Sequence, residues 1–581
     1  MNYKTKNKIY SIVLSFFIIS FVHAQEKVES KKSLNKDTVY EQLIIAAGAS
    51  LTVGEDVKLT LHSTSSIAGQ LILKPGAQIE IDGSQESKIN ILSGGLLKIE
   101  GTKQKPCVIY AKEGSPVAYI SDGNSNGGGR VVAKNAIFKG LGGAPTYRAY
   151  EYSINANSGA IDLEDCVFDK CFQVKHKTRL PADAELNFLR CKWQHSQVKP
   201  KSERKKYELW YIHETKASAG SKATIVNCDF DKTLGFFYAE NYVVEGNVFR
   251  EGIQCYPHMC PPWKSFKGNF IRSLQDGTEF AIPFGRIIED CVFIKDTGSW
   301  NPHYIGVSTG QGKGGIYGSL FWFTGGKNGG DEKNRGFEGD GVMVGHAKSG
   351  SAEDNLFTVE RNIVLPNIYG PYKKNNLSTT LITILHKSNN SSVEVKSNTI
   401  FTTNIGGLNL GETNVCGLGR IKDISSNLFI GNDSGYKINN MSHTVIDSVT
   451  DENVSYNASW RISLGSNHSA ETGKGYNRLK FSGTPTIGAN DIDDVDPQFV
   501  DVNRNPYSWA VTLGGKASMN SLMDNLSCKK EVQVYQLLGY IREGMRPQNS
   551  KLKAAGNPSD GSPDMGAVKM DKKTSSARVN I

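Results

Sequence analysis

The sequence predicts an all-β chain in which short parallel strands wind repeatedly around one axis as a solenoid. The first observation is a recurring phrase: two alternating apolar residues, a turn, Cys or Asn, and then an apolar residue. The second is that period-2 apolar alternation, with Gly at sharp turns, extends over most of the chain, whereas helical periodicity is nearly absent. The phrase returns at intervals of roughly one coil, ending at Phe168, Trp193, Phe230, Phe249, Phe270, Phe293, Val364, Phe401 and Phe429.

Residues 1–24 have the composition of a secretory signal peptide. A basic start, MNYKTKNK, precedes the apolar run IYSIVLSFFIISFV, and cleavage is expected after Ala24. The run is too short to predict a membrane span, and no later segment is apolar enough to be one. We therefore expect an exported protein that lies in the periplasm, on the cell surface or outside the cell.

The net charge suits an anionic partner only mildly. The whole chain carries +9, and removal of residues 1–24, with three lysines and no acids, leaves 9 − 3 = +6. A small positive excess favours an anionic polymer, and the basic run at Lys199–Lys206 is expected to be a solvated loop. The sequence predicts a monomer with no nucleic-acid partner and no transmembrane segment.

The rest of the chain is predicted to divide into three segments. Residues 25–37 are charged and without pattern, which indicates a linker, and residues 38–450 carry the strands of the solenoid. Residues 451–581 are irregular and are expected to close and cap it, shielding the edge of the last coil from further strand pairing. The one segment with a helical pattern runs from about Glu531 to Glu543.

The Cys and Asn positions of the phrase are predicted to form one buried column along the axis. Asn side chains there would pass amide hydrogen bonds from coil to coil, and Cys would fit as a small apolar residue. An aromatic residue two positions later would form an interior stack. Cys255/Cys260 and Cys166/Cys171 are left as possible local disulfides. The predicted column consists of Cys166, Cys191, Cys228, Asn247, Asn269, Cys291, Asn362, Asn398 and Asn427.

The strands near the N-terminus (GASLTV, GQLILKPGAQIEI, GGLLKIEGT, PCVIYA) and the closing segments DPQFVD and SPDMGA resemble those of right-handed parallel β-helix proteins of the pectin-lyase-like superfamily. The resemblance covers about residues 40–570 and implies a right-handed parallel β-helix. That scaffold carries lyases, hydrolases, esterases and non-catalytic surface proteins, so the resemblance alone leaves the activity open.

A second strand precedes the phrase in each coil, and ionisable residues gather at its C-terminal end. These strands read ELWYIHET, GFFYAEN, IQCYPHMC, TEFAIPF, HYIGVST, GVMVGHAKS, ITILHKS and GLNLGE. Stacking in register would align their ends about 4.8 Å apart in one groove. The predicted substrate-binding residues there are His213, Glu214, Glu240, Trp210 and Tyr238, with the aromatic rings stacking on sugars.

The endings GHAKS and LHKS indicate the chemistry of a polysaccharide lyase. β-Elimination of a uronate needs a cation beside the carboxylate, a base for the C5 proton and an acid for the leaving oxygen. The coil ITILHKSNNSSVEVKSNTIF also resembles the Lys-Ser coil of alginate-lyase and chondroitinase-B-like lyases, which implies Lys387 as the base. That family has an Arg on its next strand, where this chain has Gly411, and Arg420 follows outside the motif. The predicted catalytic residues are His346, Lys348, His386 and Lys387.

The loop TGGKNGGDEKNRGFEGDG offers a second site. Its carboxylates Asp331, Glu338 and Asp340 are candidate ligands for Ca²⁺. Two alternatives to the lyase stay open. One is a glycoside hydrolase with paired carboxylates, either Glu338/Asp340 or Glu214/Glu240. The other is a non-catalytic adhesin or polysaccharide-binding protein, whose ionisable strand ends would be scattered around the solenoid.

Overall fold

The computed structural model divides the chain into two compact units. Unit 1 comprises residues 1–180 and 195–197, and unit 2 comprises residues 181–194 and 198–581. The structure describes residues 25–82, 87–113, 117–121, 128–142, 152–156, 159–176, 185–197, 209–212, 222–236, 241–254, 263–273, 281–295, 303–323, 339–344, 350–351, 353–365, 379–384, 391–402, 408–409, 420–431, 436–437, 454–455, 458–460, 490–492, 495–529, 531–560 and 564–568.

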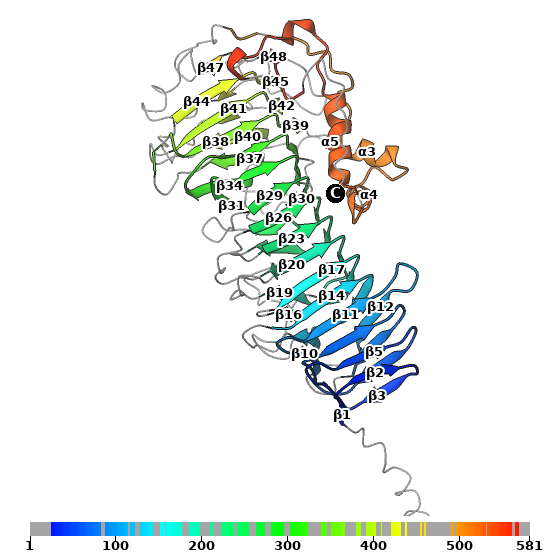
Figure 1. The fold of residues 1–581 in the computed structure, drawn as a ribbon. Helices are drawn as coiled ribbons and strands as arrows, with labels where there is room; N and C mark the ends of the chain where they lie inside the picture. Colours follow the sequence, from blue (N-terminus) through cyan, green and yellow to red (C-terminus); the bar gives the residue numbers. More distant parts are fainter. Residues whose placement is uncertain are drawn as a thin grey trace, which may run out of the picture. The chain divides into compact units, whose positions relative to one another are not determined.

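Unit 1 is a right-handed parallel β-helix whose chain visits three parallel sheets in rotation (Figure 1). Sheet A contains β1 (Gln25–Val28), β4 (Gln42–Ile45), β7 (Ser65–Ile67), β10 (Ser87–Ile91), β13 (Ala118–Ser121), β16 (Tyr152–Ala156) and β19 (Gln173–His176). Sheet B contains β2 (Lys31–Leu34), β5 (Ser50–Val53), β8 (Gln70–Leu73), β11 (Leu96–Glu100), β14 (Arg130–Lys134) and β17 (Ala160–Glu164). Sheet C contains β3 (Thr38–Tyr40), β6 (Lys58–Leu61), β9 (Gln78–Ile81), β12 (Cys107–Ala111), β15 (Ala136–Lys139) and β18 (Val167–Asp169).

Unit 2 has the same kind of winding, with longer connections between its strands. Its part of sheet B contains β20 (Glu185–Leu189), β23 (Lys222–Val226), β26 (Asn241–Glu245), β29 (Trp263–Lys267), β32 (Ile287–Glu289), β35 (Gly314–Tyr317), β38 (Leu356–Glu360), β41 (Ser392–Lys396), β44 (Arg420–Ser425) and β47 (Val454–Ser455). Its part of sheet C contains β21 (Lys192–Gln194), β24 (Asp229–Phe230), β27 (Val248–Phe249), β30 (Phe270–Ser273), β33 (Val292–Lys295), β36 (Leu320–Phe323), β39 (Ile363–Leu365), β42 (Thr399–Thr402), β45 (Leu428–Gly431) and β48 (Ala458–Trp460).

Two further parallel sheets belong to unit 2. The three-stranded sheet contains β22 (Leu209–Ile212), β25 (Thr233–Phe236) and β28 (Ile253–Gln254). The six-stranded sheet contains β31 (Ala281–Phe284), β34 (His303–Gly310), β37 (Gly339–Val344), β40 (Thr379–Ile384), β43 (Leu408–Asn409) and β46 (Tyr436–Lys437). All the described strand pairs in the two units are parallel, apart from one isolated antiparallel bridge between Ala118 and Gly142. The predicted fold class is confirmed.

Residues 25–37, predicted to be a linker, instead contain the first strands of the β-helix. β1 pairs with β4, and β2 pairs with β5. Each contributes a single buried apolar side chain, Val28 and Leu34 respectively. One apolar residue per strand is too few for a visible period-2 pattern, which is why the sequence conceals these strands.

The Asn ladder predicted from the recurring phrase is present in unit 2. Asn362 Nδ2 donates to Asn398 Oδ1 at 3.1 Å, and Asn398 Nδ2 donates to Asn427 Oδ1 at 2.9 Å. Each Oδ1 also accepts from a backbone N–H of the preceding coil, as Asn398 Oδ1 does from Asn362 N at 2.8 Å. All three side chains are fully buried. The ladder therefore satisfies polar groups that would be costly to bury alone.

Cysteine and serine continue the same column. Cys228 N donates to Asn247 Oδ1 at 2.9 Å. Ser319, which the sequence analysis did not include, stands between Cys291 and Asn362: its Oγ accepts from Cys291 N at 3.1 Å and its N donates to Asn362 Oδ1 at 2.8 Å. A serine hydroxyl provides the acceptor that the preceding coil requires, so the column tolerates it.

The interior aromatic stack is confirmed in part. Phe138 stacks on Phe168 with 4.7 Å between ring centroids, and Trp193 stacks on Phe230 at 4.5 Å. Phe270 and Phe401, which end two copies of the phrase, lie instead in a cluster outside the β-helix. Phe270 comes one residue after its ladder Asn and Phe401 three, whereas Phe230 comes two residues after Cys228. Because side chains alternate along a strand, Phe270 and Phe401 point to the face opposite to that of Phe230.

The possible Cys166/Cys171 disulfide is not formed, and both side chains are buried. Cys166 Sγ donates to Glu164 O at 3.3 Å, and Cys171 Sγ donates to Phe138 O at 3.2 Å. The two cysteines flank strand β18, whose three extended residues span about 10 Å between them. A disulfide requires less than about 7 Å. The alternative pair, Cys255/Cys260, lies outside the described residues.

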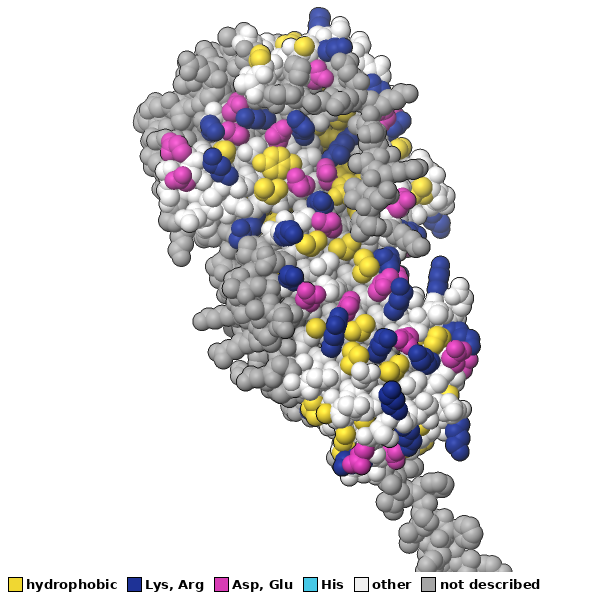
Figure 2. Space-filling view, in the orientation of Figure 1, with side chains coloured by type: hydrophobic (Ala, Val, Ile, Leu, Met, Phe, Trp, Pro, Cys, Tyr) yellow, Lys and Arg dark blue, Asp and Glu magenta, His cyan; other side chains and the backbone are white. Residues whose placement is uncertain are grey.

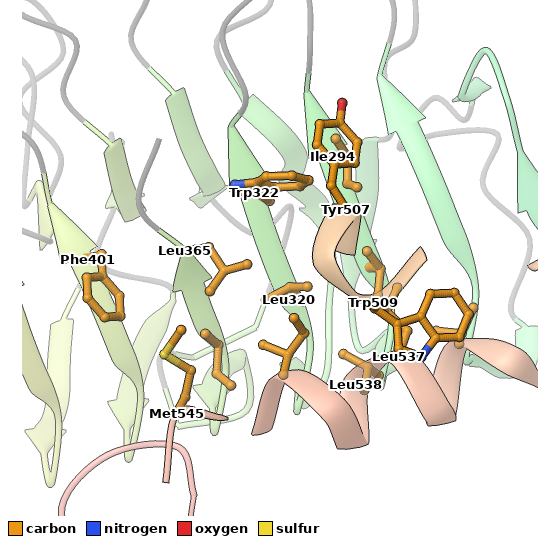
Figure 3. Packing of buried hydrophobic residues seen from close by; sticks show 14 of the residues in the cluster. Ile294, Leu320, Trp322, Leu365, Phe401, Tyr507, Trp509, Leu537, Leu538 and Met545 are labelled. Atoms are coloured by element: carbon orange, nitrogen blue, oxygen red, sulfur yellow. The ribbon is translucent and has the colours of Figure 1, made fainter. Parts of the chain in front are cut away.

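The C-terminal part of unit 2 covers the outer face of sheet C with helices. They are α3 (Pro506–Thr512), α4 (Met519–Leu526) and α5 (Gln533–Gly544), with the 3₁₀ turns η1 (Ser550–Leu552) and η2 (Pro558–Asp560). α5 matches the one predicted helix, and α3 and α4 were not predicted. Figure 3 shows Leu320 and Trp322 of sheet C packed against side chains of α3 and α5. Such an apolar outer face needs a cover, and this segment provides it.

Polar contacts anchor the helices to sheet C. Asp229, which is fully buried, accepts from Arg250 Nε at 2.7 Å and from Ser527 Oγ beyond α4. Farther along, Ala567 N donates to Thr399 Oγ1 at 2.9 Å. The region predicted to cap the solenoid thus lies along a face of the β-helix in its described part.

Candidate functional site

The eight strands predicted to carry the site are all present, in two sheets instead of one. β22, β25 and β28 form the three-stranded sheet, whereas β31, β34, β37, β40 and β43 belong to the six-stranded sheet. The residues predicted to bind substrate lie on or follow strands of the first sheet in the sequence, and those predicted to be catalytic follow strands of the second. The strands predicted to line one groove therefore belong to two separate sheets.

Within the six-stranded sheet, β37 and β40 are direct neighbours. They pair from Gly339 with Thr379 to Val344 with Ile384. In the sequence, His346 follows Val344 by two residues and His386 follows Ile384 by two residues. The segments GHAKS and LHKS therefore leave adjacent strands at the same register.

Two of the predicted site residues lie on described strands. Trp210 of β22 pairs with Leu234 in β25, and Asp340 of β37 pairs with His303 in β34 and Thr380 in β40. The others lie outside the described residues, namely His213, Glu214, Tyr238, Glu240, Asp331, Glu338, His346, Lys348, His386 and Lys387. The same holds for one or both members of each predicted carboxylate pair.

Hydrogen bonds of Asn355 fix the backbone at the corner that precedes strand β38 of sheet B. Asn355, fully buried just before β38, accepts with Oδ1 from Gly312 N at 2.9 Å. Its carbonyl accepts from Ser392 N at 2.8 Å, joining the coil of β38 to that of β41. Gly350 has a φ of 95°, and a Cβ there would lie 2.8 Å from Asn355 Nδ2, so this turn requires glycine. This turn follows Lys348 by two residues in the sequence.

Arg420 occupies a register position beside this corner. It begins β44 and pairs with Ser392, the first residue of β41. Ser392 follows Lys387 by five residues in the sequence. Sequence reasoning placed Arg420 outside the motif because the strand GLNLGE has Gly411 at the position where the family has an arginine. The parallel register between coils, which the sequence does not display, brings the backbone of Arg420 next to the coil of Lys387.

A charged cluster on sheet B was missed by sequence reasoning. Glu394 Oε1 pairs with Lys422 Nζ at 2.8 Å, and Glu394 Oε2 pairs with Lys396 Nζ at 3.4 Å. Lys396 also lies 3.3 Å from Asp423. Thr358 Oγ1 donates to Glu394 Oε2 at 3.4 Å. The alternating charges in the segments VEVK and RIKDIS were the sequence signal that could have predicted this cluster. Figure 2 shows acidic and basic side chains interspersed on this face.

The cluster holds Glu394 ionised. Burial opposes ionisation, but Lys422 and Lys396 outweigh it, so the pKa of Glu394 lies below its ordinary value. Burial raises the pKa of the neighbouring Tyr317, although its hydrogen bond with Thr358 acts in the opposite direction. An ionised Glu394 accepts hydrogen bonds but has no proton to donate, so it does not fit the role of general acid.

Comparison with known proteins yields no match to a family model, a curated protein or a solved structure. Within the described part of the chain, no group of three or more His, Cys, Asp or Glu side chains is placed to hold a metal ion. None of the described helices is long and apolar enough to span a membrane.

Proposed function

We propose that this protein is an exported polysaccharide lyase of the pectin-lyase-like type that cleaves an anionic polymer by β-elimination. One observation supports it above all. β37 and β40 pair up to Val344 and Ile384, so two segments with the same His/Lys/Ser content leave adjacent parallel strands at matching positions. Titratable groups gathered at one place in a fold are candidates for a functional site.

The reaction needs three groups acting on one uronate residue. A base removes the C5 proton, the electrons form the C4–C5 double bond, and the C4–O bond breaks as an acid protonates the leaving oxygen. In this proposal Lys387 is the base, and His346 or His386 is the acid. Lys348 extends the positive charge along the polymer.

Arg420 supplies the remaining element, a cation for the substrate carboxylate. β-Elimination requires this charge to be neutralised, since an ionised carboxylate disfavours loss of the neighbouring proton. Arg420 pairs with Ser392 at the start of the coil that follows Lys387, and a guanidinium offers the bidentate geometry that a carboxylate accepts. The arginine that the sequence motif lacks is then contributed by the next strand of sheet B.

Asp331, Glu338 and Asp340 remain proposed ligands for a Ca²⁺ ion that would bridge enzyme and polymer. His213, Glu214, Glu240, Trp210 and Tyr238, which follow or lie on strands of the three-stranded sheet, would hold a more distant part of the chain. A long anionic polymer suits such an extended surface and the mildly basic charge.

The test is an assay of the secreted chain on a panel of uronate and sulfated polysaccharides. A lyase produces an unsaturated product that absorbs in the ultraviolet, with a parallel rise in reducing ends. Lys387→Ala and Arg420→Ala should each lower kcat/KM by about 100-fold or more. Lys222→Ala, at an exposed lysine of β23, is the matched control and should leave activity unchanged.

Each other outcome argues against the proposal. Reducing ends without ultraviolet absorbance would indicate hydrolysis by paired carboxylates. Cleavage that survives loss of Lys387 would show that another group is the base. Binding without any cleavage across the panel would favour a non-catalytic adhesin.

A further inference from the structure

Two aromatic side chains of sheet B in unit 2 have their polar edges bound within the protein. Trp263, the first residue of β29, donates from Nε1 to the carbonyl of Ile287 in the neighbouring strand β32 at 2.8 Å. The hydroxyl of Tyr317, the last residue of β35, forms a hydrogen bond with the side chain of Thr358 in β38. Because these contacts satisfy the polar groups, each ring is held in one position on the sheet.

Strand alternation places these side chains on the outer face of the sheet. In β29, Phe266 is buried, and Trp263 shares the opposite, outward alternation with Ser265. In β32, Ile288 is fully buried, whereas Ile287 faces outward with 47% of its surface exposed. Ile287 therefore lies between the two rings, on the strand that separates β29 from β35. Figure 2 shows hydrophobic side chains exposed among charged ones on the sheet B face.

Gly315 allows the Tyr317 ring to lie along the sheet. It pairs with Ile287 and precedes Tyr317 by two residues on the same face of β35. A Cβ on Gly315 would lie 2.8 Å from Tyr317 Oη and 2.9 Å from Tyr317 Cε2, so the ring folds back over this residue. A glycine within a strand allows such a close approach. The ring therefore lies flat beside the exposed Ile287.

We propose that Trp263, Ile287 and Tyr317 form a binding site for a neutral polysaccharide, here called the sheet B platform. The C–H face of a sugar ring packs on an aromatic ring, and the two fixed rings offer such faces. They belong to strands two apart, which places them about 10 Å from each other and spans roughly two sugar residues of an extended chain. Ile287 contacts the chain between them. This proposal is independent of the enzymatic one, whose residues follow strands of another sheet.

The charges on the platform's strands favour a neutral chain over an anionic one. The five strands from β26 to β38 carry three acidic and two basic residues with outward or exposed side chains: Glu245, Glu289, Glu360, Lys264 and Lys267. Glu245 Oε1 lies 3.6 Å from Lys267 Nζ, so part of the positive charge is already paired. A polyanion gains no net attraction from this surface. Uncharged hydroxyl groups, in contrast, can donate hydrogen bonds to its carboxylates.

The experiment measures binding of the full-length chain to cellohexaose, xylohexaose and mannohexaose by isothermal titration calorimetry. At least one of them should bind, and Trp263→Ala and Tyr317→Ala should each raise Kd by about tenfold or more. Hexagalacturonate serves as the anionic probe, and any binding of it should be equal in wild type and both variants. The proposal is overturned if no neutral hexasaccharide binds, or if the two variants weaken only the binding of hexagalacturonate.

A third variant serves if loss of an aromatic ring disturbs folding. Ile287→Lys changes an exposed position, so the fold should tolerate it, yet a hydrated ammonium between the rings should raise Kd by about tenfold or more. Ile287→Val keeps an apolar side chain there and should change Kd little. Tyr110→Ala, at a half-buried tyrosine on sheet C, is the matched control and should leave Kd unchanged. Equal affinities of wild type and Ile287→Lys would contradict the proposal.

Discussion

Replacing Asn398 by alanine tests how much the buried ladder contributes to stability. Its Oδ1 accepts from Asn362 N at 2.8 Å and Asn362 Nδ2 at 3.1 Å, and its Nδ2 donates to Val359 O at 2.9 Å. Asn398→Ala removes these bonds from a fully buried site. Two donors of Asn362 then lose an acceptor.

The magnitude follows from those lost contacts. An orphaned buried polar group costs about 1–3 kcal/mol, so two donors together cost about 2–6 kcal/mol of unfolding free energy. Asn398→Ser should cost less, about 1–3 kcal/mol, because Ser319 already serves as such an acceptor in the same column. Asn503, which is exposed, provides the control substitution Asn503→Ala.

The assay is urea unfolding monitored by circular dichroism. The slope of the unfolding free energy against urea concentration is compared among the variants. An unchanged slope allows the midpoints to be converted into differences in unfolding free energy. The reasoning is refuted if Asn398→Ala lies within about 0.5 kcal/mol of Asn503→Ala, the usual scatter of surface substitutions. It is also refuted if Asn398→Ser is the more damaging of the two ladder variants.

Two further predictions concern ion pairs. Since the pKa of Glu394 is lowered in the folded state, its pairs with Lys422 and Lys396 stabilise the fold above the ordinary carboxyl pKa and are lost as pH falls through the lowered one. Glu394→Gln should therefore flatten the loss of unfolding free energy in urea titrations between about pH 5 and pH 3; an equally steep loss in both proteins would disprove it. Arg250→Met leaves Asp229 buried without its bidentate partner and should cost about 3–5 kcal/mol, measured in the same way. The double variant with Asp229→Asn should recover part of that loss, and no recovery would mean that the pair is not the cause.

The sequence predicted the winding of this protein because a solenoid repeats one local rule. Each coil needs a short alternating strand, a tight turn and a small polar or thiol residue facing the axis. The recurring phrase at Asn362, Asn398 and Asn427 contains all three of these features. The strands before the phrase could also be predicted from the sequence, since period-2 alternation is a local property. The same rule failed where strands hold one apolar residue, as at Val28 and Leu34.

The tertiary structure decided what long-range register alone determines. The pairing of Arg420 with Ser392, the division of the candidate strands between two sheets, and the contact of Cys528 with Cys191 join residues through space. Loops of irregular length separate them, so spacing in the sequence carries no record of which coil lies beside which. The apolar outer face of sheet C is likewise explained only by the tertiary structure, in which α3–α5 pack on it. Local periodicity therefore specified the β-helix by itself, and only the stacking of its coils showed which distant residues are neighbours.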